Sequence, residues 1–290
     1  GGHTPRVDID FQTKTFKYQS PVGPMSEIIA LASFTNQLDT TLPTSNQNTR
    51  ITAREVKGML YETIPMNAFF TITNLDEPWV VMEGNFKANL ANCNSLFDEK
   101  HFRLKGGKTI VSYCYKGKMN PIFNPKTKRL NGRLEGHAKI ENGAFNAVRQ
   151  SANFSRINSS IRFTEQTLSI GFLHLNHQRN QVRISGKVTG LLPYAFNSSG
   201  KVFGDIAVYT PDLGLDWISN YPSSIKQKST KRFTDLVDEI LAQLELKAIL
   251  VADRVRYRKF QAEHVRGSVY LSEQRVKCEN VKMKAFGGTF

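Results

Sequence analysis

Cysteine is scarce in this 290-residue sequence, which contains only Cys93, Cys114 and Cys278, far apart from one another. An odd number of widely spaced cysteines excludes a disulfide framework and a Cys-x-x-Cys metal or redox site, so at most one bridge could form. Cys114 lies in VSYCYKG, in line with Ile110 and Ser112. We interpret it as a small apolar side chain rather than a nucleophile, because no histidine is placed to activate it.

Long apolar runs are also missing. None approaches the roughly 20 residues that a membrane-spanning helix needs, and the opening GGHTPRVDIDF lacks the character of a signal peptide. We therefore expect a soluble stretch. Its opening on Gly-Gly without Met suggests a piece of a longer protein.

Motifs of catalysis are absent as well. The sequence has no Gly-x-Ser-x-Gly, His-Glu-x-x-His, Walker-type or dinucleotide-binding glycine pattern. Asp76 and Glu77 are adjacent, so a strand or turn points them in different directions. His174 and His177 are three residues apart, so a strand projects them to opposite faces, and we interpret them as solvated turn histidines rather than metal ligands. We expect no enzymatic activity, no cofactor and no metal site.

Acidic residues are outnumbered, because 39 Lys and Arg face 25 Asp and Glu, which gives a formal charge of +14. Such an excess suits an anionic partner or simply maintains solubility. The densest basic runs, RVRYRK from Arg254 and PKTKR from Pro125, are short and far apart. Because nucleic-acid binders concentrate their cations on one patch, we expect no nucleic-acid partner.

The sequence is rich in strict two-residue alternation, which is typical of strands with one wet and one dry face. In RLNGRLEGHAKIENG, apolar residues and glycines alternate with charged residues, and the same pattern recurs in WVVMEGNFKANL, QVRISGKVTG, KVFGDIAVY, VDIDF and HVRGSVYL. Turn signals such as NHQRNQ, NSSG and ENG separate the runs by a few residues, so antiparallel hairpins are the natural connection. Glycines inside these strands permit bends and bulges, which predicts strong curvature.

Helical pattern is scarce. After YPSSIKQKST, the run KRFTDLVDEILAQL places apolar residues at i, i+3, i+4 and i+7, with Thr230 as the N-cap. A second, weaker candidate is MSEIIALASF after Pro24. We expect each helix to cover one end of a sheet. This organisation predicts a β-segment over 1–220, a linker over 221–230, and a helix with further strands of the same sheet over 231–290.

A sheet with one dry face must bury it under a second sheet, under helices or under a ligand. Helices are too few. A closed β-sandwich is the ordinary solution, but these strands follow in meander order with similar alternation. We therefore predict a mainly β fold: a long, strongly twisted antiparallel meander sheet curled into an open hydrophobic groove, with one or two short covering helices. Acyl chains would occupy the groove.

The C-terminal run LELKAILVADRVRYRKFQAEHVRGSVYLSEQRVKCENVKMKAFGGTF resembles the recurring unit of the AsmA-like family, with an x-Phe-x-Ala-x-x-Val strand, a short Val-x-Leu strand and a last strand ending in Ala-Phe-Gly-Gly. RLNGRLEGHAKIENGAF, LSIGFLHLNHQRNQVRISGKVTGL and TPDLGLDWI are similar to the preceding portion of that unit, and FFTITNLDEPW is similar to an earlier repeat. The resemblance covers most of the chain, best from Leu130 onward.

The resemblance implies a large cell-envelope protein of diderm bacteria, anchored in the inner membrane and reaching across the periplasm. It implies non-enzymatic conduction of phospholipid or another acyl-chain lipid, or a role in outer-membrane biogenesis with outer-membrane assembly proteins as partners. The family's membrane anchor is not in this stretch, so membrane contact would come from other parts of the protein. The last strand would then pair with a following one, with Val281, Met283 and Ala285 on its dry face. The two-residue period slips between Val276/Cys278 and Val281/Met283, which by itself predicts a bulge or tight turn at Glu279-Asn280.

The candidate groove residues are apolar members of the alternating runs. Lys and Arg beside them, from Arg133 to Arg258, either favour anionic headgroups or form the wet outer face of the strands. A structural or adhesive β-sandwich and a basic module for acidic polymers are the alternative functions. The candidate lining residues are Leu134, Ile140, Leu168, Ile170, Phe172, Ile184, Val188, Ile206, Val208, Leu250, Val269 and Met283.

Overall fold

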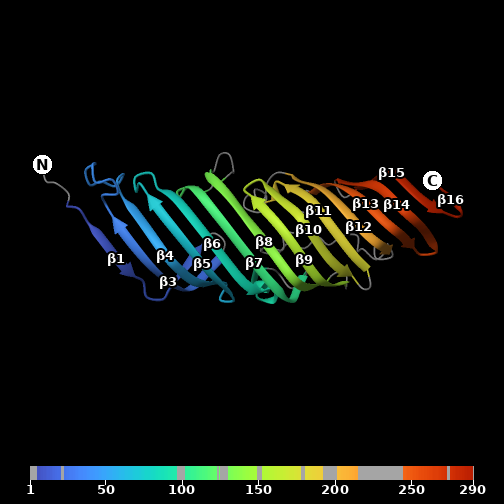
Figure 1. Ribbon diagram of the computed structural model, residues 1–290, viewed down its shortest axis with the longest axis horizontal. Coiled ribbons are helices and arrows are strands. Elements are labelled where there is room, and N and C mark those ends of the chain that lie inside the picture. The colour runs from blue at the N-terminus through green and yellow to red at the C-terminus, as the bar shows by residue number, and fades with distance from the viewer. Residues whose placement is uncertain are drawn as a thin grey trace, which may run out of the picture. The chain divides into compact units, whose positions relative to one another are not determined.

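The structure is a computed structural model that describes residues 5–20, 23–96, 102–122, 124, 130–148, 152–177, 180–191, 201–214, 244–272 and 275–289. These residues form 16 strands of one open, mostly antiparallel sheet (Figure 1). The predicted mainly β fold is therefore confirmed, and the described strands do not divide into the two sheets of a sandwich. The elements are β1 (Asp8–Gln12), β2 (Phe16–Ser20), β3 (Gly23–Thr35), β4 (Arg50–Leu60), β5 (Ile64–Thr73), β6 (Trp79–Asn89), the 3₁₀ helix η1 (Leu90–Leu96), β7 (Phe102–Lys118), β8 (Gly132–Ala147), β9 (Ala152–Thr164), β10 (Thr167–His177), β11 (Asn180–Thr189), β12 (Val202–Gly214), β13 (Leu244–Tyr257), β14 (Phe260–Ser272), β15 (Arg275–Ala285) and β16 (Gly288–Thr289).

Strands β3 to β16 lie in the sheet in the order in which they follow along the chain, as a meander requires. Short turns make this order the natural one, because an antiparallel neighbour needs only a hairpin. The first edge is different, since β1 and β2 both pair with β3, at opposite ends of it. Between them the Thr13 amide donates to the Ala30 carbonyl at 2.9 Å, so β1 and β2 act as one interrupted edge strand.

One pair departs from the antiparallel expectation. Strands β12 and β13 run parallel, in register from Val202↔Leu244 to Gly214↔Arg256. A parallel pair needs a connection that returns to the starting end of the sheet, which a hairpin cannot do. The connecting residues 215–243 contain the predicted linker and nearly all of the predicted helix KRFTDLVDEILAQL, and they lie outside the described residues.

The second predicted helix is wrong, because MSEIIALASF is part of β3. Its side chains alternate, with Ile28, Ala30 and Ala32 buried, while Ile29 and Leu31 between them are each 42% exposed. The run is apolar on both faces, so its sequence fits both the 3.6-residue period of a helix and the two-residue period of a strand. Pairing with β4 on one side and with the β1–β2 edge on the other selects the strand, since tertiary partners override a weak helical preference.

β-Bulges keep apolar side chains on one face where the two-residue period slips. Ala53 and Val56 are both buried although they are three residues apart, which a regular strand would place on opposite faces. The register between β4 and β5 shifts between them, and Glu55 adopts a left-handed φ of 50°. The same step recurs along the chain, with a left-handed residue directly before the next apolar-face position. These residues are Glu27, Glu55, Asn142, Arg156, His264 and Asn280.

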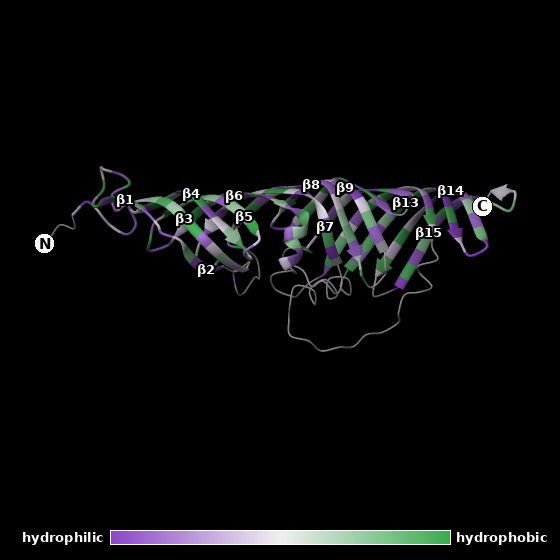
Figure 2. Ribbon diagram, turned by 90° about the horizontal axis from the view of Figure 1, so that it is seen from below, coloured by the Kyte–Doolittle hydropathy of each residue, from purple (hydrophilic) through white to green (hydrophobic). Residues whose placement is uncertain are grey.

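The bulge at Asn280 confirms the irregularity predicted at Glu279-Asn280. Its φ is 52°, and the register between β14 and β15 shifts between the pairs Arg266↔Lys282 and Ser268↔Glu279. Bulges add local twist and bend the strand. The alternation of hydrophobic and hydrophilic residues along the strands is visible in Figure 2.

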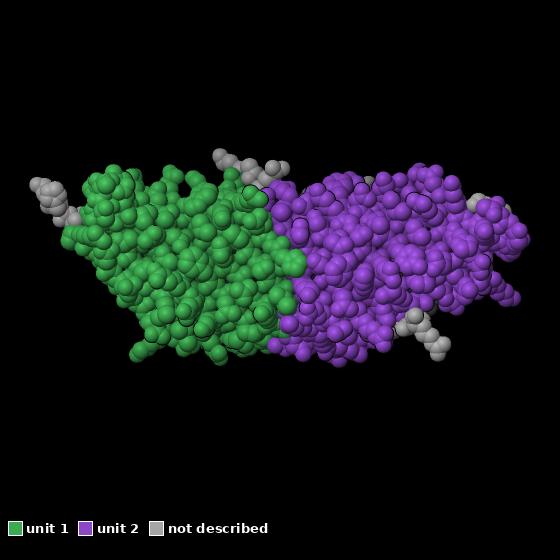
Figure 3. Space-filling view, viewed as in Figure 1, with its two compact units in different colours: residues 1–88, 110–137 green, residues 89–109, 138–290 purple. Residues whose placement is uncertain are grey.

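The chain divides into two compact units (Figure 3). Unit 1 contains Gly1–Ala88 and Ile110–His137, and unit 2 contains Asn89–Thr109 and Ala138–Phe290. Within the described residues, no helix is long and apolar enough to cross a membrane.

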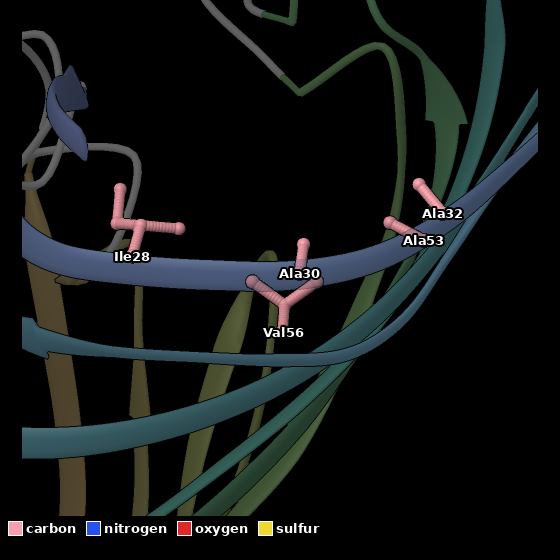
Figure 4. Close-up of a cluster of buried hydrophobic side chains, with 5 residues drawn as sticks. All are labelled: Ile28, Ala30, Ala32, Ala53 and Val56. Carbon is pink, nitrogen blue, oxygen red and sulfur yellow. The ribbon is translucent and has the colours of Figure 1, made fainter. Parts of the chain in front are cut away.

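Unit 1 buries apolar side chains on one face of its strands. Those of the first cluster all stand on one side of β3 and β4, the side toward which these strands bend (Figure 4). Partly buried side chains of β3 and β5 pack against them. Because all members come from adjacent strands, the curvature of the sheet brings them together, and small alanines fit where the strands bend. The buried members are Ile28, Ala30, Ala32, Ala53 and Val56.

A second cluster of unit 1 contains Ile72, Val80 and Tyr115. The Tyr115 hydroxyl donates to the Lys118 carbonyl at 2.9 Å, which satisfies the buried phenol. Unit 2 has a comparable cluster on β13 to β15, and Val202 centres a smaller one. The buried members of the larger cluster are Ala252, Val255, Ala262, Val265 and Ala285.

Candidate functional site

The apolar face of unit 2 is built by cross-strand ladders whose members lie directly opposite one another. Residues opposite one another in neighbouring strands share a face of the sheet. Three such ladders run from β9 or β10 to β14 or β15. They are Leu168–Val188–Gly204–Leu246–Leu271–Val276, Ile161–Ile170–Gly186–Ile206–Ala248–Val269–Cys278, and Ser159–Leu173–Ile184–Val208–Leu250–Gly267.

Eight of the twelve predicted lining residues therefore share this face of unit 2. All eight are partly exposed rather than buried, although they stand on the apolar side of the sheet. We call this surface, formed by the three ladders, the ladder face. The eight are Leu168, Ile170, Ile184, Val188, Ile206, Val208, Leu250 and Val269.

Phe172 is one of the four predicted lining residues that lie outside the ladders. The register shifts between Ile170 and Leu173, so that Leu173 and not Phe172 continues the ladder face. Phe172 pairs with Ser160, and its ring lies 5.2 Å from that of His174. The structure thus places Phe172 on the opposite, polar face.

The other three candidates lie outside the ladders. Leu134 belongs to unit 1, where it packs against the cluster of Ile72, Val80 and Tyr115. Met283 packs against the buried cluster of β13 to β15 in unit 2. Ile140 lies on β8 beside Gly143, where its Cγ2 would be 2.8 Å from a Cβ built on that glycine.

Sequence reasoning missed Leu173 and Leu175 on β10. Leu175 is buried and lies opposite Val182, one position beyond Leu173 on the same face. The sequence contains a signal for this bulge, because the apolar positions Ile170 and Leu173 are three residues apart, as Cys278 and Val281 are. Gly171 between them has no Cβ to resist the bulge.

Gly186 is a glycine because the backbones of β11 and β12 approach each other closely at this position. Gly186 has a φ of 139°, and a Cβ built on it would lie 2.3 Å from the Asp205 carbonyl oxygen. No side chain fits there. At Gly186 the middle ladder therefore exposes backbone between the side chains of Ile170 and Ile206.

The opposite face of unit 2 is polar and carries cations matched with carboxylates. Lys187, Asp205 and Lys247 lie opposite one another on β11 to β13, in alternating sign. Arg256 binds Asp212 at 2.7 Å. Exposed pairs of this kind contribute little stability. Because these cations lie opposite or beside carboxylates on the polar face, they form the wet outer face of the strands.

Tyr209 links three strands of that polar face. Its hydroxyl donates to Asp253 Oδ2 at 2.9 Å, and the Arg183 guanidinium lies 5.6 Å from its ring centroid. The hydrogen bond to Asp253 raises the pKa of the Tyr209 hydroxyl above its usual value. Because the Asp253 charge favours the protonated phenol, Tyr209 stays a neutral donor at physiological pH.

On β8, which contributes to both units, cations pair with carboxylates along their own strand. Arg133 lies 3.2 Å from Glu135, and Lys139 lies 2.7 Å from Glu141. The hydrogen bond from Lys139 lowers the pKa of Glu141, and the charge of Lys108 adds to the effect. These contacts favour the outer-face interpretation of the basic residues.

The described residues contain no group of three or more His, Cys, Asp or Glu side chains placed to hold a metal ion. His174 and His177 project to opposite faces as predicted, because β10 and β11 pair in regular register from His174↔Arg183 to His177↔Asn180. Both lie in strand β10 and are half-buried, so the prediction that they are solvated turn histidines is wrong. His177 Nδ1 lies 3.0 Å from the Asn153 carbonyl oxygen, and its ring contacts that of Phe154. All three cysteines are free.

Comparisons of the chain with family models, with curated proteins and with solved structures found no match. The AsmA-like resemblance therefore depends on the sequence motifs alone.

Proposed function

We propose that this chain is a non-enzymatic lipid-binding segment whose ladder face holds the acyl chains of phospholipid or a related lipid. One observation carries the proposal. The eight aligned apolar side chains of the ladder face remain partly exposed, and the described strands of unit 2 belong to a single sheet. Soluble proteins rarely leave a contiguous apolar surface without a partner.

The binding chemistry follows from the mostly apolar side chains of the ladders, in which Ser159 is the one hydroxyl-bearing side chain. An acyl chain gains about 0.8 kcal/mol for each methylene that it transfers from water to such a surface. This attraction has no preferred direction. A bound lipid is therefore held by contact area and can slide from one ladder to the next, which is what conduction along a sheet requires.

The AsmA-like resemblance supports the wider assignment. In that assignment the chain is part of a longer periplasmic protein of a diderm bacterium, anchored in the inner membrane, that transports phospholipid or supports outer-membrane biogenesis. Outer-membrane assembly proteins would be its further partners. Fractionation of the source cells with an antibody against this segment tests the location, and recovery from the cytoplasm contradicts it.

Lipid extraction and mass spectrometry of the purified chain test the binding itself. We expect co-purified phospholipid, and we expect Val208→Asp or Ile184→Asp to remove it while the β circular-dichroism signal stays. Ala207→Asp is the matched control, since Ala207 is exposed and neighbours Val208 on the polar face. If Val208→Asp retains lipid, or if Ala207→Asp loses it equally, the ladder face is not the binding surface.

A further inference from the structure

Two turns of unit 2 lie side by side at one end of its strands. The β13–β14 turn is closed by the pair Tyr257↔Phe260, and the β15–β16 turn is closed by Ala285↔Gly288. The pair Glu263↔Lys284 puts the two turns at the same level of the sheet. We call the six side chains around these turns the aromatic-basic rim. They are Tyr257, Arg258, Lys259, Phe260, Lys284 and Phe286.

The rim exposes aromatic surface. Phe286 is 87% exposed, and its ring centroid lies 5.8 Å from that of Phe260. Phe260 in turn packs against the buried cluster of β13 to β15, so the exposed Phe286 ring lies beside a ring that contacts the core. A phenylalanine that is exposed to water at a turn and lies beside a second aromatic ring is suited to insertion into an apolar phase.

Cations surround this aromatic pair. The Arg258 guanidinium lies 5.3 Å from the Tyr257 ring centroid, and Lys259 and Lys284 are exposed. Residues 257–262 and 284–289 contain no carboxylate side chain, while Glu263 lies directly opposite Lys284. Unit 2 contains 26 Lys and Arg against 15 Asp and Glu, a formal charge of +11, whereas unit 1 contains 13 against 10, a charge of +3. The rim therefore lies in the strongly basic unit of the chain.

We infer that the aromatic-basic rim docks on the surface of an anionic lipid membrane. Aromatic rings favour the headgroup level of a bilayer, and lysines and arginines beside them are attracted to anionic headgroups. A soluble phosphate would engage the cations but would leave Phe286 in water, so a lipid surface accounts for both features. The inference goes beyond the proposed function, because an acyl chain on the ladder face needs no contact between this rim and a bilayer.

Co-sedimentation of the whole chain with lipid vesicles tests the inference. We expect binding to vesicles of mixed phosphatidylcholine and phosphatidylglycerol, weaker binding to pure phosphatidylcholine, and loss of the difference at high salt. Lys259→Gln should weaken binding to the anionic vesicles about fivefold, and Phe286→Ser should weaken it by a similar factor or more, about fivefold at least. The matched controls Lys187→Gln and Phe203→Ser remove an exposed cation and an exposed ring of the same unit elsewhere, and they should bind as the unchanged chain does.

Three results would overturn the inference: no vesicle binding, equal loss in the control variants, or complete competition by soluble glycerol phosphate, which would indicate a headgroup pocket. Binding to heparin with loss in the same variants but no vesicle binding would point to an acidic polymer instead. The ladder-face variant Ile184→Asp separates the two proposals, because it should lose co-purified lipid and still bind anionic vesicles.

Discussion

Leu173, and not its neighbour Phe172, lies opposite Ile184 in the pairing of β10 with β11. The register shift that produces this arrangement moves one apolar side chain onto the ladder face and another onto the polar face. Two adjacent large side chains of similar hydrophobicity therefore lie on opposite faces of the sheet. Substitutions at these two positions can be compared to test the proposed binding surface.

We predict that Leu173→Asp removes co-purified lipid and that Phe172→Asp does not. A carboxylate on the ladder face must lose hydration when an acyl chain covers it, whereas one on the polar face stays in water. Mass spectrometry of the extracted lipid checks the difference. Equal lipid content in the two variants would show that the face defined by Leu173 and Ile184 is not where lipid binds.

At a left-handed bulge residue, substitution by glycine should raise the free energy of unfolding, whereas the same substitution within a regular strand should lower it. Glu55→Gly should raise the free energy of unfolding by up to about 1 kcal/mol, because a left-handed φ costs a residue with a Cβ about 1–2 kcal/mol and the extra chain entropy of glycine offsets about half of that. Glu55 lies 3.9 Å from Lys57, but both side chains are exposed, so the lost pair matters little.

The matched control for this change is Glu83→Gly. Glu83 is exposed in the middle of β6 and has an ordinary strand φ, so its replacement should lower the free energy of unfolding by about 0.5–1 kcal/mol. Urea unfolding of both variants measures the two changes. The explanation of the bulge fails if the two substitutions shift stability in the same direction.

Close backbone approach at Gly186 predicts a large effect from one methyl group. Gly186→Ala should lower the free energy of unfolding by about 3 kcal/mol or more, because its φ excludes a side chain and the new Cβ would meet the Asp205 carbonyl. Gly106→Ala is the control, since a Cβ there meets no atom within 4 Å. It should change stability by less than about 1 kcal/mol. Similar denaturation midpoints for the two variants would contradict the close approach of β11 and β12.

The cysteines should differ in reactivity toward a thiol reagent. Cys278 is exposed on the ladder face, whereas Cys93 is buried and burial raises its pKa. A raised pKa leaves less thiolate at pH 8, so Cys93 should react most slowly and should speed up only above the pH at which an exposed thiol is already ionised. Single-cysteine variants titrated with a chromogenic disulfide measure the rates, and a fast Cys93 would contradict its burial.

Bound lipid should also slow Cys278, because this residue lies opposite Val269 at the end of a ladder. Delipidated and lipid-loaded protein provide the comparison. Cys114 is half-buried on β7 and is the internal reference. Equal slowing of both thiols would indicate a general change of the sheet rather than cover over the ladder face.

Much of the sheet follows from the sequence for a simple reason. A strand has a side-chain period of two, so the alternation alone predicts that Ile184 and Val188 share one face of their strand and that Ile206 and Val208 share one face of theirs. The slip between Cys278 and Val281 likewise predicted the bulge at Asn280. Short turns favour antiparallel pairing of neighbouring strands, and the parallel pair β12–β13, joined by residues 215–243, departs from that prediction.

What the sequence by itself determined was therefore local: which side chains alternate, and where the alternation slips. The tertiary structure decided the matters that depend on a partner strand. Met25–Phe34 became a strand because β4 and the β1–β2 edge pair with it, Leu173 replaced Phe172 on the ladder face because of its register with Ile184, and β12 paired in parallel with β13. Hydrogen bonds between strands set their register and direction. These bonds join residues that lie far apart along the chain, and no periodic pattern in the sequence shows which residues they join.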